Sequence, residues 1–377
     1  MSTQNGPVAK ERCGRWNKSP TYGLPHRRAL NTSTEYPMAK RYGAIILLTY
    51  LCLTVSTSQA EPSPYPPSQV IERIVWYWDT YERAAPGSDQ WPVTWADDGH
   101  LYACWGDGGG FNGTNSDGRA KMGVARIEGT PPDWLGRNIW GGKNPKSSQP
   151  TEEGKARPIC IDGILYLYAI KQDTWDKGRM FKSTDHGMTW TWTDFDWEYL
   201  FKNSTFLQFG KDYQGARDNY VYLYFLVEEK KHYGLARAPM DRIMMRNRYE
   251  VFVGLDAGGK PMWSKATHGY EPAFEAPDGA GWGHQVMYHP LLQRYLFTKF
   301  HDKAGGWGIF DAPDPWGPWT TVAYYESGKW MDDKWKFCFS FNQKWMSADG
   351  KTMWMIFSGW PEYDAYHHIK CTLVLKE

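Results

Sequence analysis

The chain has 377 residues, with 43 Lys and Arg against 42 Asp and Glu, so its formal net charge is +1. A chain so close to neutral lacks the basic surplus needed to bind nucleic acid, and we expect no such partner. Aromatic residues make up 16% of the sequence, and 38 Gly and 24 Pro supply turns. This composition favours a β-rich protein with broad stacking surfaces, as is common among sugar-handling proteins.

The N-terminal 60 residues are predicted to be a targeting segment and not part of a folded domain. Residues 38–60 combine two basic residues, a short apolar run and small residues before Ala60, which is the pattern of a secretory signal peptide. An uncleaved signal anchor is the alternative. Residues 1–37 are expected to be a non-native or disordered extension, and 61–69 a Pro-rich linker. We therefore expect a secreted or periplasmic protein with no membrane contact after cleavage.

Five units recur along the rest of the chain, each a short apolar strand, a turn and an aromatic-rich strand. Three of the turns are Asp-Gly, a strong hairpin signal. The strand pairs are predicted at 91–95 and 101–105, 156–161 and 164–170, 205–209 and 220–227, 285–288 and 294–300, and 339–346 and 352–357. Five such units predict an all-β fold, a five-bladed β-propeller over residues 70–377. Two independent β-sandwiches are the rival fold.

One segment, Ser183 to Trp190, fits the pattern S-x-D-x-G-x-T-W, the Asp-box of sialidase-type propellers. The pattern predicts a hairpin turn in which Asp185 bonds backbone amides, Gly187 takes a positive φ and Trp190 packs on its blade. Asp185 is therefore interpreted as structural. The arginine triad that sialidases carry cannot be assigned, so sialic acid is not the expected substrate.

Three carboxylates are predicted to be catalytic because the starts of the inner strands and the ends of the second strands should meet at one channel mouth. Asp89 precedes the first inner strand, and Asp107 ends the next strand one hairpin later. Glu228 ends a strongly apolar strand, where desolvation would keep a carboxyl group protonated. Paired carboxyl groups of unequal pKa are what glycosidic hydrolysis requires.

The same topological argument predicts five substrate-binding residues, which are Lys155, Arg157, His284, His301 and Asn342. Trp91 is added as a candidate stacking platform for a sugar ring. No spacing suggests a metal ligand set, and no cofactor is expected, although a cation in the channel stays open. Four cysteines follow the signal, at 104, 160, 338 and 371, and are either paired or buried as free thiols. We expect a monomer.

The stretch from Asp89 to Gly110, DQWPVTWADDGHLYACWGDGGG, resembles the opening of a bacterial five-bladed propeller family that includes endo-D-arabinanases. The family was formerly a domain of unknown function. The resemblance continues through 154–158, 287–296 and 312–319. It implies glycoside hydrolysis, with Asp89 and Asp107 at the two acidic positions of the family.

These observations lead to one main function and two alternatives. The main prediction is a secreted glycoside hydrolase that cleaves a polysaccharide, arabinan-like or related. The first alternative is a carbohydrate-binding propeller without catalysis. The second is a polysaccharide lyase, in which His284 or a tyrosine would remove a proton beside a uronate neutralised by Lys155 or Arg157.

Overall fold

The computed structural model describes residues 63–143, 153–171, 177–198, 203–227, 231–266, 269–301, 304–359 and 364–377. The predicted N-terminal extension, the predicted signal peptide and Glu228 lie outside these ranges. Among the described residues, no helix has the length and apolar character that a membrane crossing needs.

The described chain is built of strands, and the prediction of an all-β protein is confirmed. One sheet has the order β2 (Asp89–Trp95), β3 (Leu101–Gly106), β4 (Gly123–Thr130) and β5 (Asp133–Trp140). The next contains β6 (Glu153–Ile161), β7 (Ile164–Lys171), β8 (Lys177–Ser183) and β10 (Trp197–Glu198), with β9 (Thr191–Trp192) beside β8. These four-strand runs are antiparallel.

A larger sheet joins two further antiparallel runs. The first consists of β11 (Thr205–Gln208), β12 (Tyr220–Val227), β13 (His232–Pro239), β14 (Glu250–Leu255) and β15 (Pro261–Ser264), with β16 (Phe274–Glu275) on β13. The second consists of β17 (Gln285–His289), β18 (Arg294–Phe300), β19 (Trp307–Ala312) and β20 (Thr320–Tyr325). The short 3-10 helices within the described ranges are η1 (Lys211–Tyr213), η3 (Met240–Arg242), η4 (Arg246–Arg248) and η5 (Gln343–Trp345). Strands β11 and β17 pair in parallel, so these two runs begin at the same face.

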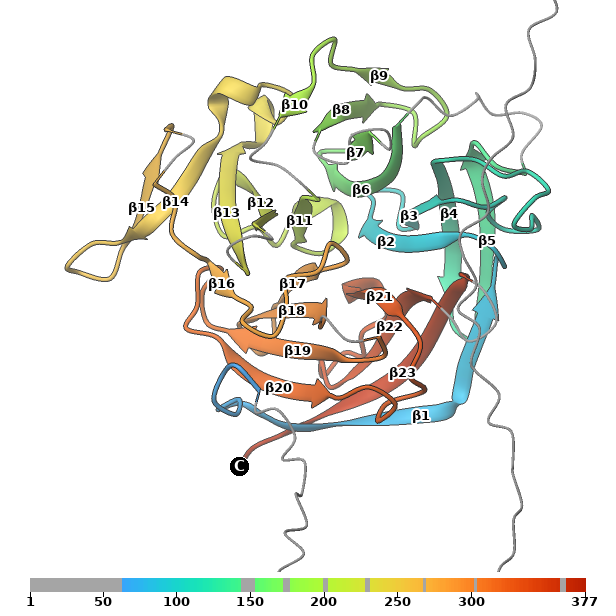
Figure 1. The fold of residues 1–377 in the computed structure, drawn as a ribbon. Helices are drawn as coiled ribbons and strands as arrows, with labels where there is room; N and C mark the ends of the chain where they lie inside the picture. The colour runs from blue at the N-terminus through green and yellow to red at the C-terminus, as the bar shows by residue number, and fades with distance from the viewer. Residues whose placement is uncertain are drawn as a thin grey trace, which may run out of the picture. The chain divides into compact units, whose positions relative to one another are not determined.

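The last sheet contains β21 (Lys336–Phe341), β22 (Thr352–Gly359) and β23 (Tyr366–Leu375), and its fourth strand is β1 (Ile71–Ala84). Strand β1 pairs antiparallel with β23, so the first strand of the described chain completes the sheet formed by the last three (Figure 1). Strand β1 precedes the five predicted units and is not among them. This pairing joins the two ends of the described fold and leaves β23 without an open edge.

The innermost strands form a closed ring. Strand β2 contacts β6, β6 contacts β11, β11 contacts β17, β17 contacts β21, and β21 contacts β2 (Figure 1). The ring places the beginnings of strands that are far apart in the sequence around one centre.

Several inner strands carry a β-bulge close to their beginning. The register shifts after Gln90 in β2, after Gly154 in β6 and after Phe337 in β21. Gln90, Lys155 and Cys338 have positive φ values of 84°, 54° and 55° at these points. A bulge bends its strand and re-aims the side chains beside it. The bulge in β6 is thus the local reason that Lys155 departs from the regular alternation of its strand.

The first strand of the fifth predicted hairpin has different bounds in the structure. Its first strand was predicted at 339–346, but β21 covers Lys336–Phe341. The strand stops because Asn342 caps η5, its Oδ1 accepting a hydrogen bond from the Trp345 amide at 3.0 Å. Asn342 therefore lies after the inner strand rather than at its beginning, and the prediction that it lines the mouth is wrong.

The turn around Asp185 holds itself together with its own side chains. The Asp185 carboxylate accepts hydrogen bonds from the Thr189 amide at 2.9 Å and the Thr189 hydroxyl at 2.6 Å. Gly187 has a φ of 87°, and the Trp190 indole donates to its carbonyl at 3.0 Å. The carboxylate is thus occupied within the turn, as the interpretation of Asp185 as structural requires.

Candidate active site

Asp89 and Asp107 meet at a single lysine. Asp89 begins β2 and Asp107 follows β3, and the cross-strand pairing of Asp89 with Gly106 brings them side by side. The Lys155 Nζ, from β6, lies 2.9 Å from Asp89 Oδ2 and 3.1 Å from Asp107 Oδ2. The predicted meeting of these two carboxylates at one end of the inner strands is thus present, with Lys155 between them.

The two carboxylates differ in their exposure to solvent. The Asp89 side chain is 5% exposed and that of Asp107 is 32% exposed. Arg119 reaches Asp107 from the solvent side, with Nη2 at 3.6 Å from Oδ1. Because Asp107 is the more exposed of the two, it is the carboxylate that an incoming ligand meets first. Gly106, between the two carboxylates, has no room for a side chain, because a Cβ there would lie 2.9 Å from Asp89 Oδ1.

Burial has the largest single effect on the pKa of both Asp89 and Lys155. It raises the pKa of the Asp89 carboxyl and outweighs the opposing effect of Lys155. Asp89 Oδ1 is buried without a hydrogen-bond partner in the described structure. Burial alone would lower the pKa of the Lys155 ammonium, but the two carboxylates outweigh it, so this pKa is raised. The lysine remains a cation, and Asp89 is the carboxyl that holds a proton more readily than usual.

A third carboxyl group, Asp364, was missed by the sequence analysis. Its backbone carbonyl accepts a hydrogen bond from the Gly87 amide, which ties it to the segment just before Asp89. Burial raises the pKa of the Asp364 carboxyl to about 6, and the negative charge of Asp89 adds to this. No local signal marks Asp364, because it lies in the loop before β23 and reaches the site only through the closure of the fold.

Arg157 and His284 are buried side chains linked to this cluster by charge, because Arg157 acts on both the Asp89 carboxyl and the His284 imidazole. The Arg157 side chain is 1% exposed and donates to the Trp282 carbonyl at 3.2 Å and to the Ala156 carbonyl at 3.3 Å. His284 is fully buried, and burial followed by the charge of Arg157 lowers its pKa to about 3. A buried neutral imidazole has no access to a substrate proton, so the structure gives no support to His284 as the base of a lyase.

Two further predicted binding residues are buried in other surroundings. Trp91 is 0% exposed and packs on Trp105, with ring centroids 5.5 Å apart. This burial leaves no face for a sugar ring, so the prediction of Trp91 as a binding residue is replaced by a packing role. His301 lies 2.8 Å from a buried Asp278 carboxylate that also accepts from Lys299 at 2.8 Å. Its side chain is 7% exposed, and it belongs to this internal cluster.

The cysteines among the described residues are Cys104, Cys160, Cys338 and Cys371, and all four are buried free thiols. The sequence left open whether these cysteines form disulfides or are buried as free thiols, and the structure shows free thiols. Burial raises the pKa of the Cys338 thiol to about 11. These thiols act as small apolar core groups.

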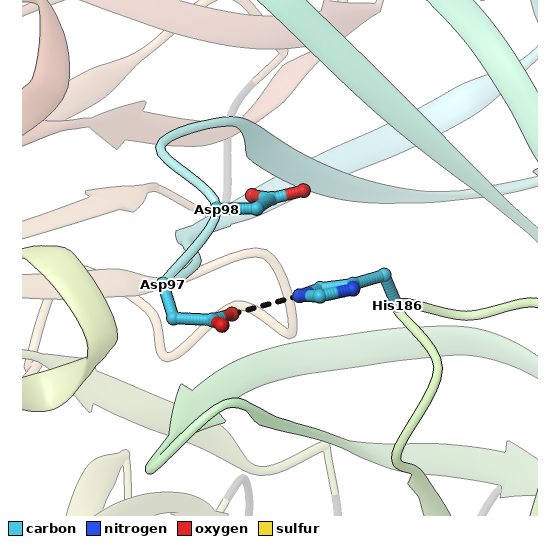
Figure 2. A group of neighbouring side chains, drawn as sticks. All are labelled: Asp97, Asp98 and His186. Carbon is cyan, nitrogen blue, oxygen red and sulfur yellow. Dashed lines mark hydrogen bonds and ion pairs between the residues drawn. The ribbon is translucent and has the colours of Figure 1, made fainter.

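Possible metal ligands gather at the other end of the inner strands. Asp97 and Asp98 lie in the turn after β2, and the His186 Nε2 is 2.8 Å from Asp97 Oδ1 (Figure 2). A second group consists of Asp97, Cys160 and Asp212. The Asp98 carboxylate already accepts from the Tyr102 hydroxyl at 2.8 Å, and Asp212 accepts from the Gly163 amide at 2.8 Å. These contacts connect the turn after β2 with the neighbouring turns, and they engage carboxylate oxygens of Asp97, Asp98 and Asp212.

Comparisons with known proteins address the fold. No family model matches the sequence, and a search of curated proteins finds no match. A solved structure of a candidate hydrolase from Bacteroides ovatus has 12% identity and a TM-score of 0.51, over 76% of this chain and 86% of that one. The GH43_1 enzyme from Xanthomonas citri has 13% identity and a TM-score of 0.47, over 79% and 94%.

An endo-arabinase from Bacteroides thetaiotaomicron has 11% identity and a TM-score of 0.44, over 78% of this chain and 96% of that one. At 12% identity, the likeness to the Bacteroides ovatus protein shows a shared fold and leaves the activity open. The other two likenesses have lower TM-scores and add no argument.

Proposed function

We propose that the chain is a secreted glycoside hydrolase in which a five-bladed propeller gathers acidic groups at one mouth. The observation that carries this proposal is the arrangement of Asp89 and Asp107 around the Lys155 ammonium, with Asp364 beside them. The five runs of strands, each starting at the closed inner ring, are taken as the blades.

Hydrolysis of a glycosidic bond needs one carboxyl group that donates a proton and one carboxylate that acts as base or nucleophile. Asp364, whose pKa burial raises to about 6, suits the donor. Asp107 suits the second role, because it is the more exposed of the bridged pair and contacts two cations, Lys155 and Arg119. Asp89, the more buried of the two carboxylates, would hold Lys155 in place. Glu228, outside the described residues, stays a further candidate for the proton donor.

The substrate class follows from the sequence resemblance, which implies an arabinan-like or related glycan. Export would follow from cleavage after Ala60, and mass spectrometry of the exported protein should then find an N-terminus near Glu61. A mature protein that keeps residues before Met38 would contradict this part of the proposal.

The catalytic assignment is tested with Asp107→Asn, which keeps the shape and removes the charge. Turnover, measured as reducing ends released from arabinan, should fall by at least about 100-fold, the usual scale for losing acid–base or nucleophilic help. Asp196→Asn is the matched control, because Asp196 also contacts two cations, Lys171 and Arg179, and is 23% exposed. Equal activity of the two variants would remove Asp107 from the reaction.

A carbohydrate-binding protein without catalysis is the second candidate. The burial of Asp89 and the pairing of both carboxylates with one lysine favour it, because such a cluster can be purely structural. The parent protein would then bind a glycan and release no reducing ends. New ultraviolet absorbance in the products would instead indicate elimination, the reaction of a lyase.

A further inference from the structure

An aromatic surface begins next to the carboxylate cluster. The Lys155 Nζ lies 5.7 Å from the centre of the Trp282 ring, within the range of a cation–π contact. Trp282 precedes β17 and is half-buried, and its ring packs 4.7 Å from Phe337 at the beginning of β21. The indole thus spans the junction of two inner strands, at the end where Lys155 holds the carboxylates.

The surface continues outward to a second tryptophan. Phe300, at the end of β18, lies 5.4 Å from Trp282 and 5.5 Å from Trp335. Trp335 immediately precedes β21 and is 45% exposed, whereas Phe300 is 7% exposed. The Phe300 and Trp335 rings meet edge to face at 81°, and this contact restricts an indole that is still 45% exposed and offers apolar surface to solvent.

From this geometry we propose that Trp282 and Trp335 form a binding subsite for a neutral sugar ring next to the bond that is cleaved. The proposal rests on the proposed function for the meaning of the neighbouring carboxylates. The C–H groups on one face of a sugar ring carry a slight positive charge, which suits the negative face of an indole. A glycan lying on the two tryptophans would reach Asp107 with its next residue.

The charges around the subsite favour a neutral sugar over an acidic one. Lys155 is engaged by two carboxylates, and Arg119 by Asp107. Beside Trp335, the Lys336 ammonium is paired with Asp332, and Lys334 lies 3.6 Å from Asp333. These four described cations are therefore already paired with carboxylates, and a uronate that bound to one of them would have to displace its partner.

The test measures binding to arabinan, xylan and a β-1,3-galactan by affinity electrophoresis, with a polyuronate as the acidic counterpart. Asp364→Asn is used as the background, so that the proposed proton donor is lost while the carboxylate of Asp107 still engages Lys155 and Arg119. Trp335→Ala should weaken binding to at least one neutral glycan about tenfold or more, and Trp335→Phe should restore part of it. The matched control is Trp192→Ala, because Trp192 is 48% exposed and lies 5.6 Å from Phe181, far along the chain in β9.

The outcomes separate this proposal from the hydrolase proposal. Binding lost in Trp335→Ala with a parent protein that never releases reducing ends supports the subsite and rejects the hydrolase. Hydrolysis by the parent protein with binding unchanged in Trp335→Ala rejects the subsite alone. Binding to the polyuronate only, no binding to any of the neutral glycans, or equal losses in the Trp335 and Trp192 variants would each overturn the subsite.

Discussion

Replacing Lys155 with Met tests whether one buried cation holds the site together. Met fills similar space and keeps the strain of the left-handed backbone at φ 54°, so the change removes mainly the charge. At an effective dielectric constant of about 20, each contact near 3 Å has a Coulomb energy of roughly 5 kcal/mol, most of it offset by desolvation. Breaking a buried pair usually leaves a net loss of about 3–5 kcal/mol.

The loss of stability in Lys155→Met should depend on pH. Without the lysine, only the charge of Arg157 still opposes the burial that raises the pKa of Asp89. A carboxyl group whose folded-state pKa exceeds its unfolded value of about 3.9 makes folding less favourable as pH rises through this range. The loss should therefore be close to its full size at pH 7.5 and clearly smaller at pH 4.5, where Asp89 folds with its proton.

Chemical denaturation of the parent protein and the variant at both pH values gives the two free-energy differences. Lys171→Met is the matched control, because Lys171 also lies 2.9 Å from a carboxylate, on Asp196, but both side chains are more exposed at 19% and 23%. Its loss should stay within about 1 kcal/mol. A loss of that size for Lys155→Met, or one independent of pH, would refute the account of the buried cluster.

Three further predictions follow from the same contacts. Asp185→Ala should lower the free energy of unfolding by about 1–2 kcal/mol through its lost turn bonds, while the folded fraction keeps its activity; lost turnover at unchanged stability would argue against this. If Asp364 donates the proton, kcat/KM should fall as pH rises through about 6, and Asp364→Asn should lose turnover together with this limb of the pH profile; an unchanged profile would exclude it as the donor. The buried thiols at 104, 160, 338 and 371 should react with a thiol reagent only after denaturation, and rapid labelling of the native protein would contradict their burial.

The sequence determined the local features of this fold. The hairpin from β2 to β3 was predicted within two residues, because an Asp-Gly turn between aromatic strands specifies its own geometry. Asp89 and Asp107 were predicted to lie together for the same reason, since a single hairpin separates them. The fifth hairpin was misplaced at its first strand because Asn342 starts a 3-10 turn within an apolar stretch that reads as a continued strand.

Only the tertiary structure decided which side chains meet and which are accessible. Lys155 comes from the next sheet and Asp364 from the last loop, so their approach to Asp89 depends on the closed ring and on the pairing of β1 with β23. Burial likewise depends on neighbours distant in sequence, as Trp91 shows by packing on Tyr366. A pKa near 6 for Asp364 arises from desolvation and charges contributed by several sheets, which no local pattern contains.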